Sequence, residues 1–140
     1  MRRIGADGEP IWTTEVGERG AVFSKPGRCY RTSVSSNAGL KRYRLGQTGA
    51  DASVRTGFGI FGAPEPWGPW TTIYQTDSWD VAPGESCSFP TTWMSPGGAV
   101  PHLVFSGDDS FSVRRVVLRL AGDEGRGRAR PLRLRDRGDR

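Results

Sequence analysis

Hydrophobic and polar residues alternate along much of the middle of the chain, and a period of two is typical of β-strands. Phe58–Gly62 and Trp70–Thr76 are runs of β-forming residues, and the stretch 63–70 that joins them holds three prolines and two tryptophans. Each proline fixes φ at about −65° and extends the residue before it, so the loop loses little conformational entropy on folding. The stretch 57–74 therefore predicts two strands joined by a stiff turn.

Two neighbouring groups of segments extend this β pattern. Cys29–Ser36 alternates as a strand, Asn37-Ala38-Gly39 predicts a turn, and the alternation resumes over 40–45. With 57–62 and 70–76 these segments predict four consecutive antiparallel strands. A second unit of three strands is predicted at 87–94, 102–106 and 111–120, with a fourth supplied by the N-terminal segments 11–14 or 20–23. The fold class is all-β.

The two ends of the chain differ in composition from the middle. Residues 1–9 are polar and contain glycine, and they predict a flexible leader. Residues 121–140 are mainly Gly, Asp, Glu and Arg with isolated leucines, so they cannot bury a core and are expected to be disordered. We therefore expect one folded domain over residues 10–120.

The sequence Ala63-Pro64-Glu65-Pro66-Trp67-Gly68-Pro69-Trp70, followed by Thr-Thr-Ile-Tyr, resembles the last part of a group of β-propeller proteins. These are five-bladed propellers related to glycoside hydrolases, of the type named domain of unknown function DUF 4185. Residues 29–43, 89–95 and 103–115 are similar to the family's neighbouring strands and closing blade. The resemblance covers roughly residues 10–120.

This resemblance implies about two antiparallel four-stranded blades of a partial five-bladed propeller. Complete relatives look secreted and act on or bind carbohydrate, whereas residues 1–9 carry no apolar run typical of a signal peptide. A whole propeller needs several hundred residues. We therefore expect a fragment of a longer protein; the alternative is a small open sheet or sandwich that covers its exposed face in another way.

The net charge of +5 comes from the ends of the chain. Residues 4–120 hold 11 Lys and Arg against 11 Asp and Glu, so the predicted domain is neutral. A neutral domain does not predict a nucleic-acid partner. The sequence contains no apolar run of about 20 residues, so no membrane span is predicted.

The chain contains few residues that ligate metals or form disulfides. Cys29, Cys87 and His102 are three potential zinc ligands, and a closed site uses four, so neither a metal nor another cofactor is predicted. His102, as the single histidine, is expected to be structural. In the propeller alignment Cys29 and Cys87 begin successive first strands, which leaves either a disulfide or two small buried thiols.

In the propellers that the chain resembles, carbohydrate binds at the axis, on the face where the first strands begin. Strand direction then places Asn37, Trp67 and Trp70 on the opposite face, where the tryptophans form a packed corner or, alternatively, a sugar-stacking platform. The candidate substrate-binding residues on the site face are Tyr30, Arg31, Trp79, Asp80, Asp108 and Asp109.

The candidate residues do not supply a complete hydrolytic pair. Glycoside hydrolysis uses two carboxyl groups on either side of the scissile bond, and in the family these come mainly from other blades. Asp108 and Asp109 are adjacent, so they predict either a turn or one contribution to a polar pocket. Arg31 either holds a sugar or carboxylate or forms an ion pair within the sheet. The catalytic residues are therefore unknown, and whether the chain is an enzyme stays open.

The sequence predicts a partial glycoside-hydrolase-like propeller domain that acts on or binds carbohydrate. The alternative is a non-catalytic β-rich interaction module that packs against another such segment. A nucleic-acid binder acting through the arginine-containing tail is a third possibility, which the neutral domain disfavours.

Overall fold

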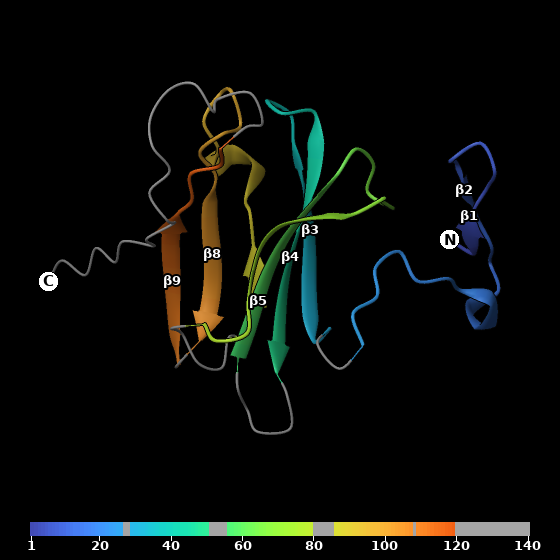
Figure 1. Ribbon diagram of the computed structural model, residues 1–140, viewed down its shortest axis with the longest axis horizontal. Coiled ribbons are helices and arrows are strands. Elements are labelled where there is room, and N and C mark those ends of the chain that lie inside the picture. The colour runs from blue at the N-terminus through green and yellow to red at the C-terminus, as the bar shows by residue number, and fades with distance from the viewer. Residues whose placement is uncertain (27–28, 51–55, 80–85, 108, 120–140) are drawn as a thin grey trace, which may run out of the picture.

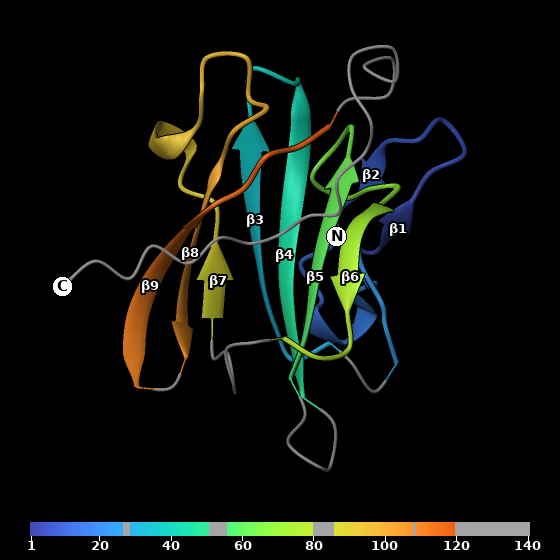
Figure 2. The same cartoon turned by 60° about the vertical axis from the view of Figure 1, so that its left-hand side comes forward.

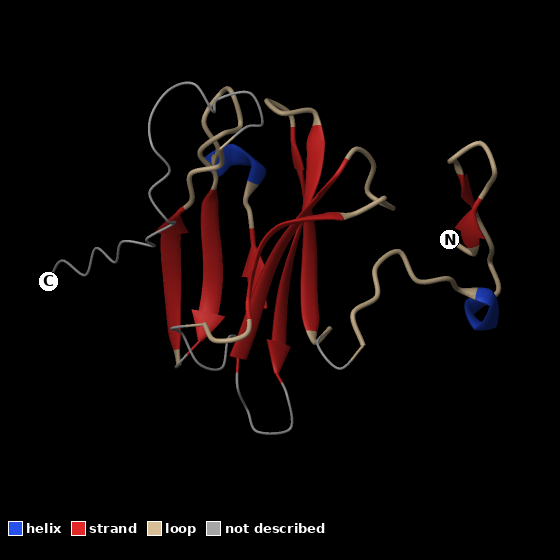
Figure 3. Ribbon diagram, in the orientation of Figure 1, coloured by secondary structure: helices blue, strands red, loops and turns tan. Residues whose placement is uncertain are grey.

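The computed structural model describes residues 1–26, 29–50, 56–79, 86–107 and 109–119 (Figure 1). They form an all-β structure of antiparallel sheets with four, three and two strands. The helices among the described residues are two short 3-10 turns, η1 (Val16–Glu18) and η2 (Thr91–Trp93) (Figure 3). No helix in this part of the chain is long and apolar enough to cross a membrane.

The four-stranded sheet follows the order of the chain, as predicted. Its strands are β3 (Arg31–Asn37), β4 (Arg42–Ala50), β5 (Thr56–Ala63) and β6 (Thr71–Thr76). β4 and β5 extend beyond the expected ranges because a strand ladder uses backbone groups, and glycines continue it without side chains. Gly49 pairs with Gly57 in this extension. β4 therefore covers part of the segment between the predicted strands 40–45 and 57–62.

The three-stranded sheet consists of β7 (Ser86–Ser88), β8 (His102–Gly107) and β9 (Ser110–Arg115), again in chain order. The prediction of a strand over 87–94 was wrong beyond Ser88. Pro90 has no N–H for a ladder, and it leads into η2. β9 ends at Arg115, although the next residues still pair: Val116 donates its N–H to the Pro101 carbonyl and Leu118 to that of Ala99.

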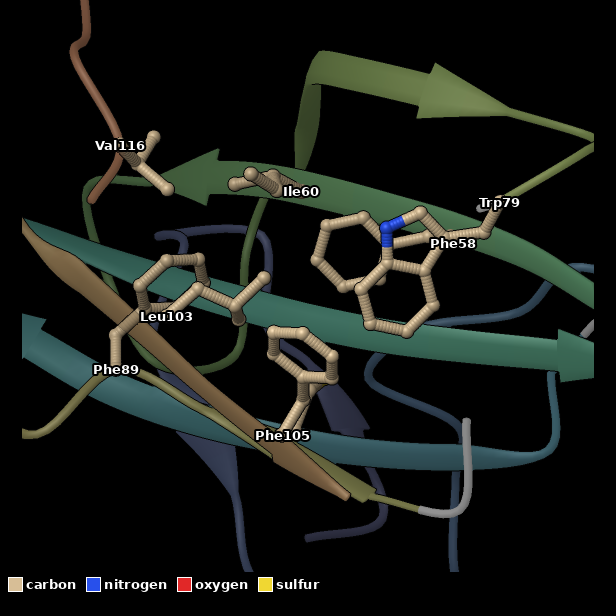
Figure 4. Packing of buried hydrophobic residues seen from close by; sticks show 8 residues of the cluster. Phe58, Ile60, Trp79, Phe89, Leu103, Phe105 and Val116 are labelled. Carbon is tan, nitrogen blue, oxygen red and sulfur yellow. The ribbon is translucent and has the colours of Figure 1, made fainter. Parts of the chain in front are cut away.

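A hydrophobic core lies between these two sheets (Figure 4). The first strands of the sheets, β3 and β7, are neighbours and run in the same direction (Figure 2). The two sheets approach each other closely at Gly46, where an added Cβ would lie 2.9 Å from the Cys87 sulfur. The buried members of the core are Phe58, Ile60, Trp79, Cys87, Phe89, Leu103, Phe105 and Val116.

The N-terminal residues pack beside the four-stranded sheet. β1 (Arg3–Ile4) pairs with β2 (Pro10–Ile11), and Trp12 then contacts Trp67 edge to face at 6.5 Å. Further along, Phe23 packs on Phe61 with ring centroids 4.7 Å apart. The prediction that 11–14 or 20–23 completes the second sheet was therefore wrong, because Trp12 and Phe23 contact the β5–β6 turn and β5 instead.

Candidate functional site

The antiparallel order of the strands separates two ends of the molecule. β3 and β7 begin at one end, where β4 and β8 end and β5 and β9 begin (Figure 2). Asn37 and the β5–β6 turn, with its tryptophans, lie at the other end. This division matches the two faces expected from strand direction, and we refer to the first as the strand-start end.

The predicted site residues at the strand-start end have different environments. Tyr30 and Arg31 are exposed, and the Arg31 guanidinium lies 5.3 Å from the centre of the Tyr30 ring. Asp109 is exposed and occupies the turn before β9 with φ of 54°. Trp79 is only 5% exposed and packs in the core, so its ring is covered. The candidates Asp80 and Asp108 lie outside the described residues.

A small hollow opens at the same end, between the ends of β4, β5 and β6. Its floor is formed by Gly49 and Gly57, which are directly opposite each other. The absence of side chains at both positions leaves space against the sheet. The remaining lining residues are Lys25, Gln47, Phe58, Thr76 and Asp77.

The lining of this hollow combines several kinds of hydrogen-bonding group. Gln47 is buried and donates from Nε2 to the Thr48 carbonyl at 2.9 Å. Lys25 extends over the sheet with Nζ 5.8 Å from the centre of the Phe61 ring, and Asp77 is exposed just after β6. The lining therefore contains a cation, a carboxylate and an amide around two glycines, while the Thr76 hydroxyl donates its proton to the Ser78 carbonyl at 2.7 Å.

Tyr30 connects this hollow with the predicted candidates. Its backbone N–H donates to the Thr48 carbonyl at 3.2 Å, which places it beside the strand that carries Gln47 and Gly49. Sequence reasoning missed Lys25, Gln47 and Asp77, because they come together only through the pairing of β4 to β6 and the path of the segment before β3. The available signal was the repetition of glycine at 49 and 57, on either side of the β4–β5 connection.

The cysteines and the histidine are not part of this hollow. Cys29 and Cys87 are free, so they form no disulfide. Burial raises the pKa of the Cys87 thiol to about 12. His102 Nδ1 lies 2.9 Å from the Trp93 carbonyl, as expected for a structural histidine. Among the described residues, no group of three or more His, Cys, Asp and Glu is arranged for a metal.

The tryptophan turn at the opposite end is a packed corner. Trp67 and Trp70 are both partly buried, and each places its indole nitrogen out of contact with solvent. Gly68 between them has φ of 106°, a conformation that favours glycine. The packed-corner interpretation therefore accounts for both side chains, while Trp12 remains 69% exposed beside them.

No protein-family model matches the chain, and no curated protein or solved structure matches it either.

Proposed function

We propose that this chain is a carbohydrate-binding segment of a larger β-propeller related to glycoside hydrolases, and that the hollow at the strand-start end holds sugar hydroxyl groups. The observation that carries the proposal is the glycine floor of Gly49 and Gly57 surrounded by Lys25, Gln47 and Asp77. Sugar hydroxyls both donate and accept hydrogen bonds. A carboxylate, an amide and an ammonium group offer the complementary acceptors and donors.

The neighbouring aromatic residue suits the same ligand class. Tyr30 is 61% exposed beside β4, so a large part of its surface is available to a sugar ring. The apolar face of a sugar packs on an aromatic ring, while its hydroxyls turn toward polar groups. Tyr30 and the hollow together therefore provide both kinds of contact.

Binding is better supported than hydrolysis. Asp77 is the one carboxylate among the lining residues of the hollow, whereas glycoside hydrolysis ordinarily uses two. The arrangement of the two larger sheets supports the propeller part of the proposal. Their first strands, β3 and β7, are parallel neighbours, and the later strands of each sheet follow in chain order on the side away from the other sheet. Successive radial sheets around an axis have this relationship.

Affinity electrophoresis of the full chain in gels containing different soluble polysaccharides tests the binding function. We expect at least one polysaccharide to retard the chain, and Asp77→Asn to weaken this retardation about tenfold by removing a charged acceptor. Glu65→Gln is the matched control, since Glu65 is an exposed carboxylate in the turn at the opposite end. Equal retardation of both variants would place binding elsewhere, and no retardation by any polysaccharide would count against the function.

A second candidate function is a non-catalytic module that packs on another β-sheet. Phe111 and Val113 share a face of β9 and are 71% and 46% exposed, although Val113 lies opposite the buried Val104 of β8. The opposite face of this sheet already packs on the four-stranded sheet. If the exposed face packs in the same way, sedimentation of the chain will show self-association that Phe111→Lys abolishes, whereas a monomer at all concentrations would contradict pairing between copies.

A further inference from the structure

Arg44 lies in β4 with its side chain directed into the space between the two sheets. It is paired with Ser35 of β3 on one side and with Gly62 of β5 on the other. Alternate residues of a strand share a face, so Arg44 faces the same way as Gly46. An added Cβ at Gly46 would contact Cys87 and Phe89 of the other sheet. Arg44 therefore belongs to the interior side of β4.

Arg44 is a largely buried cation that has no counter-charge among the described residues. Arg44 is only 3% exposed, and its Nε has no hydrogen-bond partner there. No carboxylate in this part of the chain lies within ion-pair distance of it; the ion pair that is present joins Arg2 to Glu18. Desolvation lowers the pKa of Arg44, yet a guanidinium keeps its proton at neutral pH. An uncompensated buried charge is strongly unfavourable.

The surrounding strands make an anion at this position more favourable. The seven strands of the two larger sheets contain five arginines and neither aspartate nor glutamate. The net charge of the domain is zero, but its charges are unevenly distributed. The strands carry positive charge, and the acidic residues lie outside the strands. A positive potential of this kind attracts small anions. The five arginines are Arg31, Arg42, Arg44, Arg114 and Arg115.

We propose that Arg44 is the cation of a second binding site, which takes a small carboxylate ion between the two sheets. A planar guanidinium matches a carboxylate through two parallel N–H···O bonds, and the unpartnered Nε is one of the donors that this geometry uses. The cross-strand neighbours Ser35 and Gly62 are small and uncharged. Arg44 is two residues from Arg42, the exposed first residue of β4, so the site lies near the end of the sheet.

This inference does not depend on carbohydrate binding. The proposed sugar hollow includes Gly49 and Gly57, toward the opposite end of β4 and β5, whereas Arg44 pairs with Gly62. A ligand at one position therefore does not occupy the other, and either site can fail experimentally without the other.

Thermal unfolding of the full chain in increasing acetate tests the site, with NaCl added to keep the ionic strength constant. We expect the Tm of the unmodified chain to rise with acetate, because a ligand that binds the folded state stabilises it. In Arg44→Met the acetate dependence should weaken at least about tenfold. This variant should fold and show a higher Tm without acetate, since an apolar side chain of similar length replaces an unpaired buried charge.

Arg42→Met is the matched control, because Arg42 lies on the same strand but is exposed. It should retain the acetate response of the unmodified chain. An equal acetate response in Arg44→Met and the unmodified chain would overturn the proposal, as would a Tm of the unmodified chain that does not depend on acetate.

A second measurement keeps the proposal testable if Arg44→Met does not fold. In ¹H–¹⁵N NMR spectra of the unmodified chain, the Nε–Hε resonance of Arg44, assigned through its absence from Arg44→Lys, should shift with acetate and saturate. A resonance that does not move over the range in which Tm changes would contradict a direct contact with the carboxylate.

Discussion

The indole of Trp79 stacks on the phenyl ring of Phe58, with ring centroids 4.5 Å apart and an angle of 15° between the planes. Trp79 also contacts Phe105 at 4.8 Å, so it joins a strand of the four-stranded sheet to one of the three-stranded sheet. The residue follows β6 and closes the core near the strand-start end. Its position gives Trp79 a structural role in place of the ligand contact expected from the sequence.

Replacement of this indole should destabilise the whole domain. We expect Trp79→Ala to lower the free energy of unfolding by about 3–5 kcal/mol, because a large aromatic side chain is lost from the core. Urea unfolding followed by far-UV circular dichroism measures this change. Trp12→Ala should cost less than about 1 kcal/mol, since Trp12 is largely exposed, and similar costs for the two variants would contradict the packing described here.

The close approach of the sheets at Gly46 predicts a cost for a single added methyl group. We expect Gly46→Ala to destabilise by about 1–3 kcal/mol, because the new Cβ would crowd the Cys87 sulfur and the Phe89 ring. Gly17→Ala is the matched control, since nothing lies within 4 Å of an added Cβ there. Thermal unfolding compares the variants.

The unfolding of a double variant can show whether the methyl group added at residue 46 contacts the Cys87 sulfur. Cys87→Ala removes the sulfur that lies closest to the added Cβ, so the double variant should lose less stability than the sum of the two single variants. Additive costs would show that Gly46 and Cys87 do not contact each other.

The two cysteines should differ in reactivity. Cys29 is exposed, whereas burial raises the pKa of Cys87 to about 12 and keeps it as a thiol at pH 8. Iodoacetamide should therefore modify Cys29 in the folded chain and Cys87 only after unfolding, as mass spectrometry of peptides would show. Rapid modification of Cys87 in the folded chain would contradict its burial.

The same shift predicts a dependence of stability on pH. The folded state holds the Cys87 proton more tightly than the unfolded state, whose pKa is near 9.0. The stabilisation from this group is therefore complete below about pH 9 and is lost as the pH rises toward 12. Unfolding in urea across this range should show a steeper loss of stability for the unmodified chain than for Cys87→Ala.

The sequence predicted the order of strands well because each strand carries a local signal. Alternation in 29–36 and the proline-containing turn after 57–62 do not depend on distant residues, and both sheets follow the expected order. The end of β7 at Ser88 was predictable in principle, since Pro90 cannot donate to a ladder. The N-terminal segments were misplaced because a short apolar run does not show which aromatic partner it packs against.

The candidate site was less accessible to sequence reasoning. Strand direction correctly placed Tyr30 and Arg31 at the strand-start end, but it could not show that Trp79 turns into the core. The hollow depends on Gly49 facing Gly57 and on Lys25 reaching from a distant segment. The burial of Arg44 was equally hidden, because an arginine in an alternating strand ordinarily predicts a solvent-exposed position.

The central claim is that the hollow at the strand-start end binds sugar. Backbone ¹H–¹⁵N NMR of the full chain, titrated with an oligosaccharide of the polysaccharide that retards it, tests this claim most directly. We predict saturable shifts centred on the amides of Gly49, Gly57 and Asp77, with those of Asn37 and Gly98 at the opposite end unchanged. Shifts centred on the tryptophan turn, or no saturable shift at the glycine floor, would contradict the account.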